Sequence, residues 1–314
     1  FMTSNGEVQA VRGVSFEVKK GEILGIVGES GSGKSVTSMS VLRLLADTAV
    51  IKKDSKIEFE GRNLIDISKK EMRKIRGVEI GFIFQDPMTS LNPTMTVGKQ
   101  IEEVFVGRKG MTRAEVRERA LEILRLVGIN EPERRYKQYP HQLSGGQRQR
   151  IIIARCLVVT PKIIFADEPI SALDVSLQAQ VINMLMDLQD KYKLSMLLIA
   201  HDLAVVRQIA DQINIMYFGA IVESAPSSEI YKNAQHPYTK VLLKAAPSIS
   251  KGLEDAGFDI DLKPGDIPDP AKPMPGCPFC TRCIYADERC MKERPEETEV
   301  SPGHTVRCHK AGQI

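Results

Sequence analysis

The segment Gly28-Glu29-Ser30-Gly31-Ser32-Gly33-Lys34-Ser35 decides how the rest of the chain is interpreted. Before it, residues 23–27 form a short apolar run that is typical of a buried parallel strand. After it, residues 36–46 carry apolar side chains at near-helical spacing. The sequence therefore predicts a strand, a glycine-rich loop and a helix in direct succession.

This loop matches the phosphate-binding pattern G-x-x-x-x-G-K-[S/T]. Its glycines let successive N–H groups curl around an anionic oxygen, and the helix start adds its positive end. Lys34 is expected to reach the β- and γ-phosphates, and the Ser35 hydroxyl to bind Mg²⁺. The residues predicted to hold the nucleoside triphosphate are Gly28, Ser30, Gly31, Ser32, Gly33, Lys34, Ser35 and Val36.

The composition argues against two other classes of protein. The 314 residues carry 43 basic and 40 acidic side chains, and aromatic residues make up 5% with no tryptophan. This balance gives no indication of nucleic-acid binding. No apolar stretch approaches the ~20 residues of a membrane-spanning helix, and no signal peptide is recognisable. We expect a cytosolic chain that docks on membrane proteins.

The pattern along the chain predicts an α/β fold with a helical insertion. Residues 96–157 are helical in character, with a capping box formed by Thr112 and Glu115. Strand–helix alternation follows and predicts a parallel sheet with helices on both faces. The predicted strands are 8–18, 57–60, 80–84, 162–166, 195–200, 213–218 and 220–223, and further helices are 175–192, 203–210 and 238–246.

Polar residues end several predicted strands, at the edge where open α/β sheets bind ligands. Asp167 is expected to hold Mg²⁺, and Glu168 to polarise the attacking water. Gln85 can bridge the metal or this water, and His201 can bond a γ-phosphate oxygen. Taken singly, each is also an ordinary structural residue. The phosphate loop favours the catalytic interpretation.

A second anion-seeking helix start is predicted at Leu143-Ser144-Gly145-Gly146-Gln147. Ser144 suits a helix N-cap, and the two glycines leave the backbone uncovered. A simple cap would explain these residues in isolation. Because the chain already contains a phosphate loop, we interpret the segment as a contact to the nucleotide of another copy. Ser171 to Asp174 forms a tight turn after the two acids.

In this order the motifs resemble those of an ABC-transporter ATPase, over about residues 6–248. The resemblance implies two cassettes facing head to tail, each site pairing one phosphate loop with the other's Ser144-Gly145-Gly146. ATP closes this dimer and hydrolysis reopens it. Gln147 and Asp174 join the predicted ATP-binding residues, Ser35, Gln85 and Asp167 the predicted Mg²⁺ ligands, and Glu168, His201 and Gln85 the catalytic ones.

Three further features resemble the ATP-binding subunits of dipeptide/oligopeptide (and nickel) importers: Ser90-Leu91-Asn92-Pro93, His236-Pro237-Tyr238-Thr239 and the cysteine-bearing C-terminal tail. The resemblance implies a second ATPase subunit, identical or related, two membrane permease subunits and an extracellular peptide-binding protein. It also implies a peripheral position on the cytoplasmic face of the membrane. One departure concerns the aromatic residue that usually stacks on adenine, for which only Phe1 and Phe16 are candidates.

Five of the six cysteines lie in the last forty residues. Thiolates suit zinc or an iron–sulfur cluster, and a cytosolic cysteine cluster favours metal over disulfides. The residues alone allow Cys277, Cys280, Cys283 and Cys290 as a ferredoxin-like run. The importer resemblance instead implies Cys277, Cys283, Cys290 and Cys308. We expect a [4Fe–4S] cluster on that quartet, with zinc or no metal as alternatives.

The sequence thus predicts an α/β P-loop NTPase of the ABC ATPase type. Residues 1–248 form the nucleotide-binding domain, with a helical signature subdomain at about 90–160. Residues 249–314 form a small cysteine-rich, metal-binding extension. The predicted function is ATP hydrolysis that powers di- and oligopeptide uptake. The alternatives are a non-transport ABC ATPase acting on nucleic acid or ribosomes and a non-catalytic regulatory subunit.

Overall fold

The computed structural model describes residues 1–4, 6–106, 110–171, 173–245, 262–263, 268–272 and 274–314. The chain divides into two compact units. The first unit comprises residues 1–18, 22–67 and 198–314, and the second comprises residues 19–21 and 68–197. The predicted domain boundary near residue 248 lies outside the described residues.

The first unit is built on strands in the order β11-β12-β10-β9-β3. Their bounds are β3 (Ile23–Val27), β9 (Gln212–Tyr217), β10 (Ala220–Pro226), β11 (Thr298–Ser301) and β12 (His304–Val306). β3 and β9 are parallel, whereas β9, β10, β12 and β11 pair antiparallel. The predicted purely parallel sheet is therefore wrong for this edge. Phe218 and Gly219 cause the reversal, because their φ angles of 46° and 79° suit a two-residue hairpin turn.

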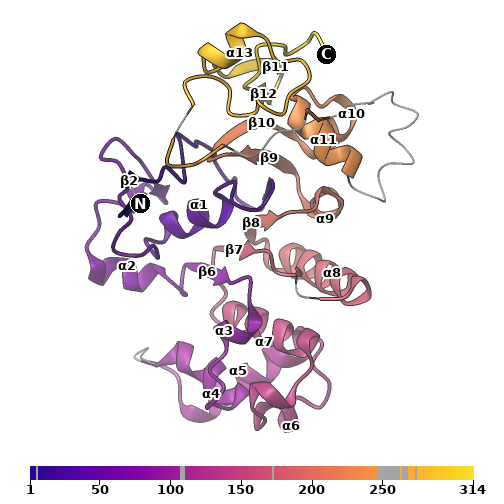
Figure 1. The fold of residues 1–314 in the computed structure, drawn as a ribbon. Helices are drawn as coiled ribbons and strands as arrows, with labels where there is room; N and C mark the ends of the chain where they lie inside the picture. Colours follow the sequence, from indigo (N-terminus) through magenta and orange to yellow (C-terminus); the bar gives the residue numbers. More distant parts are fainter. Residues whose placement is uncertain (5, 107–109, 172, 246–261, 264–267, 273) are drawn as a thin grey trace. The chain divides into compact units, whose positions relative to one another are not determined.

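The helices of the first unit lie around these strands (Figure 1). They are α1 (Lys34–Val41), α9 (Leu203–Ile209), α10 (Ser227–Asn233), α11 (Pro237–Ala245) and α13 (Glu288–Lys292), and two small hairpins are β1 (Met2–Thr3) with β2 (Gly6–Glu7) and β4 (Glu58–Phe59) with β5 (Arg62–Asn63). α1 is shorter than the predicted helix 36–46. It ends at Val41, and Arg43 adopts a left-handed φ of 53°.

Residues 8–18 do not form the predicted strand. Burial does alternate along Val14, Ser15, Phe16 and Glu17, as the pattern indicated. Yet the segment joins no ladder, and it makes single backbone hydrogen bonds such as that from Arg12 N–H to the Gly219 carbonyl at 2.6 Å. An alternating pattern predicts which side chains face inward. A strand also needs a neighbouring strand to pair with, and the pattern does not predict one.

The second unit contains the predicted helical insertion. Figure 1 shows α3 to α7 gathered together in this unit. Its elements are α2 (Lys69–Ile75), β6 (Ile80–Ile83), α3 (Pro87–Ser90), α4 (Val97–Glu102), η1 (Glu103–Phe105), α5 (Arg113–Leu126), α6 (Pro132–Tyr136), η2 (Pro140–Gln142), α7 (Gly145–Leu157), β7 (Ile163–Asp167) and α8 (Val175–Tyr192). β6 runs parallel to β7, and β8 (Ser195–Ala200) begins in this unit and ends in the first.

α5 shows why the insertion is helical. The predicted capping box is present, with the Thr112 side chain accepting from Glu115 N–H and the Glu115 carboxylate accepting from Thr112 N–H. The helix buries one apolar stripe, made of Ala120, Leu121, Ile123 and Leu124. Gly128, with φ 71°, follows the helix end. Burial of this stripe drives the packing of α5 against α4 and α7.

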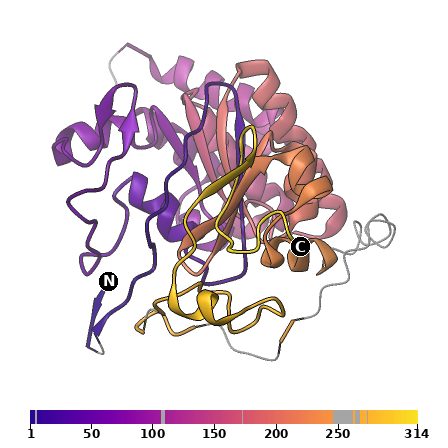
Figure 2. The same ribbon diagram turned by 90° about the horizontal axis from the view of Figure 1, so that it is seen from above.

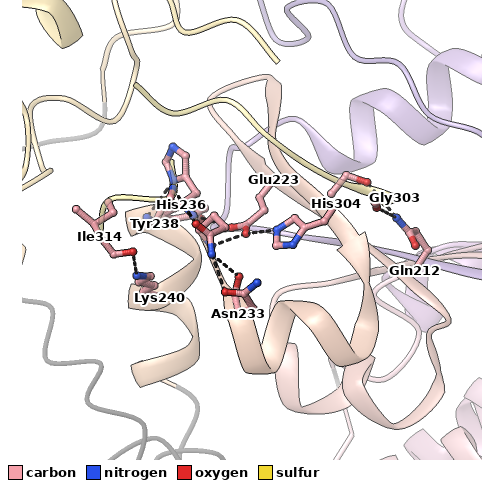
Figure 3. A network of polar contacts seen from close by, with 12 residues as sticks. Gln212, Glu223, Asn233, His236, Tyr238, Lys240, Gly303, His304 and Ile314 are labelled. Carbon is pink, nitrogen blue, oxygen red and sulfur yellow. Dashed lines mark hydrogen bonds and ion pairs between the residues drawn. The ribbon is translucent and has the colours of Figure 1, made fainter. Parts of the chain in front are cut away.

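The C-terminal segment, residues 277–314, contributes β11 and β12 to the sheet of the first unit. This pairing was not predicted from the sequence. Figure 2 shows the segment running along β10, and β12 pairs there through Glu223↔Val306 and Ser224↔Thr305. The fully buried Glu223 accepts from the N–H groups of Gln235 (2.6 Å) and His236 (3.0 Å) at the start of α11. Its Oε1 also contacts His304 Nε2 at 2.8 Å (Figure 3).

A helix that crosses a bilayer must be both long enough and apolar enough to span its hydrocarbon core. No helix among the described residues meets both requirements.

Candidate active site

The phosphate loop follows β3, whose five residues are all buried. Two of its glycines have no room for a side chain. A Cβ on Gly28 would lie 2.1 Å from the Met216 carbonyl oxygen, and one on Gly33 would lie 2.4 Å from that of Ala10. Gly33 also has φ 99°, which L-residues rarely adopt. The pattern's glycines are therefore required by the surrounding backbone.

Lys34 and Ser32 are the buried polar side chains of this loop. Lys34 is 5% exposed and donates to the carbonyls of Gly28 (2.7 Å) and Glu29 (3.0 Å). The Ser32 hydroxyl is 4% exposed and has no hydrogen-bond partner among the described residues. A buried hydroxyl of this kind usually has a partner, so the loop fits an anionic ligand. Ser30 and Gly31 are exposed, and Ser35 and Val36 are half-buried at the start of α1.

The strand ends of the second unit bring two predicted catalytic residues together. Gln85 Nε2 donates to Glu168 Oε2 at 2.8 Å. Asp167, the last residue of β7, is 5% exposed. Glu168 has a left-handed φ of 45°, and such strained residues cluster at functional sites. His201 belongs to the first unit, where it is exposed after β8, and Asp202 caps α9.

The signature segment forms a regular helix start in the second unit. Ser144 is the N-cap of α7, and its hydroxyl accepts from Gln147 N–H at 3.3 Å. Gly145 faces open space, and a Cβ on Gly146 would lie 3.1 Å from Leu177. The Gln147 and Asp174 side chains, both predicted to bind ATP, bond within their own helix starts. Their predicted role stays a prediction.

The C-terminal cysteines line a common cavity of about 20 Å³ in the first unit, made in part by Cys277, Cys280, Cys283, Cys290 and Cys308. All are free thiols. Burial raises the pKa of Cys277 to about 12 and that of Cys308 to about 11, so both are protonated at neutral pH. Among the described residues, no three His, Cys, Asp or Glu side chains are placed to hold a metal ion. The predicted metal-binding character of this extension is therefore not confirmed.

Comparisons with known proteins agree with these motifs. The family described as "ABC transporter" matches residues 11–171, and the family described as "Oligopeptide/dipeptide transporter, C-terminal region" matches residues 222–290. The oligopeptide transport ATP-binding protein OppD of Bacillus subtilis is 47% identical over 98% of this chain and 85% of its own length. The dipeptide transport ATP-binding protein DppD of the same organism is 48% identical over 98% and 91%.

Solved structures show the same fold. MJ0796, a bacterial ABC transporter cassette determined as a dimer, matches with a TM-score of 0.64 at 30% identity, over 72% of this chain and 94% of that chain. A post-hydrolysis dimer of the same cassette bound to ADP and Pi gives 0.62 at 31% identity, over 69% and 90%. The chain belongs to the ABC transporter ATP-binding family. The predicted family and P-loop NTPase fold are confirmed.

Sequence reasoning missed a contact that this ABC ATPase makes with its own phosphate loop. Glu29, at a variable position of the pattern, is bonded by Tyr238 and by Arg282. Tyr238 lies in the quoted segment His236-Pro237-Tyr238-Thr239, and Arg282 lies between Cys280 and Cys283. Tyr238 and Arg282 each lie within a motif that the sequence analysis had singled out. The sequence gives no indication that either residue bonds to Glu29.

Proposed function

We propose that this chain is the ATP-hydrolysing subunit of a membrane importer for di- and oligopeptides. The observation that carries the proposal is that one chain joins an ABC transporter domain to the C-terminal region of oligopeptide/dipeptide transporters. Near full-length relatives are named as peptide transport ATP-binding proteins. These names do not favour the alternative of an ABC ATPase acting on nucleic acid or ribosomes.

Catalysis in this proposal is positioning and charge stabilisation. The loop from Gly28 to Val36 cradles the phosphates, with Lys34 at the β- and γ-phosphates. Ser35, Gln85 and Asp167 would hold Mg²⁺, and the bound ion would supply positive charge beside the phosphate oxygens. Glu168 orients the attacking water. The hydrogen bond of 2.8 Å from Gln85 to Glu168 supports this assignment, because it joins a residue proposed to bind the metal to the residue proposed to orient the water. His201 completes the site.

The remaining part of the site belongs to a second ATPase subunit, identical or related. Its signature helix start, equivalent to Ser144-Gly145-Gly146-Gln147, faces the phosphate loop together with the turn at Asp174. The open space at Gly145 supports this role because the backbone there is accessible. Two permease subunits and an extracellular peptide-binding protein complete the importer, and the ATPase lies peripherally on the cytoplasmic face of the membrane.

Glu168→Gln tests the function. Loss of the carboxylate removes the group that polarises water, whereas ATP still binds and holds the dimer closed. We expect ATP turnover to fall by at least about a hundredfold, with retained nucleotide binding and a dimer on size exclusion. Glu296→Gln, an exposed carboxylate, is the control and keeps the parental rate. Parental turnover in Glu168→Gln contradicts the assignment, and a complex isolated with nucleic acid instead of permeases contradicts the transport function.

We also propose that the C-terminal cysteines hold a [4Fe–4S] cluster through Cys277, Cys283, Cys290 and Cys308. The support is that these residues line one cavity together and that cysteine thiolates are the usual ligands of iron–sulfur clusters. Soft thiolates also bind zinc, which is the alternative. Iron and sulfide analysis after anaerobic purification decides between them, and zinc without iron contradicts the cluster. Loss of iron in Cys308→Ser with retention in Cys280→Ser supports the quartet.

A further inference from the structure

Glu29 is the first variable residue of the phosphate loop, and its carboxylate is held by the C-terminal segment. Arg282 Nη1 donates to Glu29 Oε2 at 2.9 Å, and Arg282 Nη2 donates to Glu29 Oε1 at 3.1 Å. Only 13% of the arginine side chain and 29% of the glutamate side chain are exposed. A two-pronged, partly buried pair is among the strong and directional contacts in proteins.

The backbone of Glu29 is fixed from two other directions. Its N–H donates to the Tyr238 hydroxyl at 2.8 Å, and Tyr238 is fully buried on α11. Its carbonyl accepts from Lys34 Nζ at 3.0 Å, in the same loop. One residue thus joins the C-terminal segment, α11 and the lysine that is expected to meet the phosphates.

Arg282 is itself held by the residues around it in the cysteine segment, residues 277–290. Its guanidinium lies 5.8 Å from the centre of the Phe279 ring, and Phe279 is 1% exposed. That ring packs against Tyr238 at 5.4 Å between centroids. The backbone of Arg282 donates to the Phe279 carbonyl at 3.1 Å, as does that of Cys283 at 3.0 Å. A displacement of the Cys280–Cys283 turn therefore moves the guanidinium.

We propose that Arg282 is a positioning residue for nucleotide binding. Acting through Glu29, it holds the loop and Lys34 in the arrangement that receives phosphate oxygens. The cysteine segment thereby sets the affinity of the chain for ATP. This inference rests on the proposed function in one respect, namely that the loop binds ATP.

The test is a double-mutant cycle on the full chain, with Kd measured for a fluorescent ATP analogue. Arg282→Gln and Glu29→Gln each free the loop, so each should weaken binding about tenfold, the ratio expected for one strong contact. The double variant should bind no more weakly than either single one, because both changes break the same pair. Arg289→Gln is the matched control, since it breaks an exposed Arg–Glu pair of the same segment (Arg289 to Glu293, 3.0 Å) and should leave Kd unchanged.

Two readouts separate positioning from a general loss of structure. In the assembled transporter, Arg282→Gln should raise KM for ATP rather than lower kcat at saturating ATP. Arg282→Lys, which restores the charge without the two-pronged geometry, should recover part of the affinity. If Arg282→Gln fails to fold, Glu29→Gln and Arg282→Lys carry the test.

The inference is overturned if Arg282→Gln folds and binds ATP with the parental Kd, if the two losses add in the double variant, or if Arg289→Gln weakens binding equally. A parental chain that does not bind the analogue at all contradicts the proposed function instead. The two failures are therefore distinguishable.

Discussion

The phosphate loop and the C-terminal segment of the first unit are stabilised in different ways. Within the loop, Lys34 bonds the carbonyls of Gly28 and Glu29, and Ser32 N–H bonds the Glu29 carbonyl. Several contacts of residues 277–314 instead reach residues far away in sequence: β12 pairs with β10, and Lys240 donates to the Ile314 carbonyl.

This difference means that loss of a single contact should affect the two segments differently. The loop owes its shape to glycine geometry and to bonds within the loop, and its distant contacts from Tyr238 and Arg282 act on Glu29. We therefore expect loss of one distant contact to change ATP affinity without unfolding the loop. The C-terminal segment is held by the β10–β12 pairing, by the buried Phe279 and by the buried contact of Glu223 with His304, so we expect loss of Glu223 to weaken its attachment. Variants that remove one kind of contact at a time test this difference.

The largest effect is expected for Glu223→Ala. This change leaves the N–H groups of Gln235 and His236 and the ring of His304 without their acceptor in a fully buried site. Breaking a buried polar network of this kind costs about 3–5 kcal/mol of unfolding free energy. Urea denaturation measures it, with limited proteolysis showing release of the C-terminal segment.

Glu297→Ala is the control for this variant, because its pair with Arg307 is half exposed at the glutamate. It should cost less than about 1 kcal/mol. Equal losses in the two variants would mean that the buried network is not what attaches the segment.

The loop is broken most directly by Gly33→Ala. The new Cβ would meet the Ala10 carbonyl oxygen at 2.4 Å, at a φ of 99°. Strain of about 1–3 kcal/mol follows, and we expect ATP affinity to fall more than about tenfold. Gly61→Ala, at φ 74° with open space around it, controls for backbone strain alone and should leave ATP affinity intact. Parental affinity in Gly33→Ala contradicts the role given to this close approach.

Lowering the pH should lower the free energy of unfolding through His236, which directly precedes α11. Burial lowers the pKa of His236 from its ordinary 6.5 to about 4, although the nearby Glu223 opposes the shift. Between pH 6.5 and 4 the unfolded chain therefore binds more protons than the folded one, and stability falls as the pH falls. The expected loss is about 1.4 kcal/mol per pH unit in the middle of that window.

The His236 ring lines the same cavity as Lys310 and His309. His236→Asn keeps an acceptor for Tyr238 N–H and removes the titration. Denaturation curves at pH 6.5 and 5 should differ less for this variant than for the parent. An identical pH dependence would exclude His236 as the source.

The contrast also explains what could be predicted from the sequence. β3, α8 and β8 fall where the pattern placed them, and the glycine-rich loop lies between a strand and a helix as predicted, because each signal is local. Gln85 and Glu168 are hydrogen-bonded to each other, and their catalytic roles stay predictions. The β10–β12 pairing and the Arg282–Glu29 pair were missed, because they join residues with no common local pattern. The polar partner of a buried charge depends on which residues the fold brings together. Sequence periodicity predicts only which face of a helix or strand is apolar.

The smallest effect is expected at the contact between α11 and the phosphate loop. Tyr238→Phe removes the acceptor for Glu29 N–H while keeping the ring that packs on Phe279. Loss of one such bond costs about 1 kcal/mol, so ATP affinity should fall by about fivefold. Tyr285→Phe, on the rim of the cysteine cavity, is the matched control and should not change it. If Tyr238→Phe leaves the affinity unchanged while Arg282→Gln lowers it, the side-chain pair alone couples the C-terminal segment to the loop.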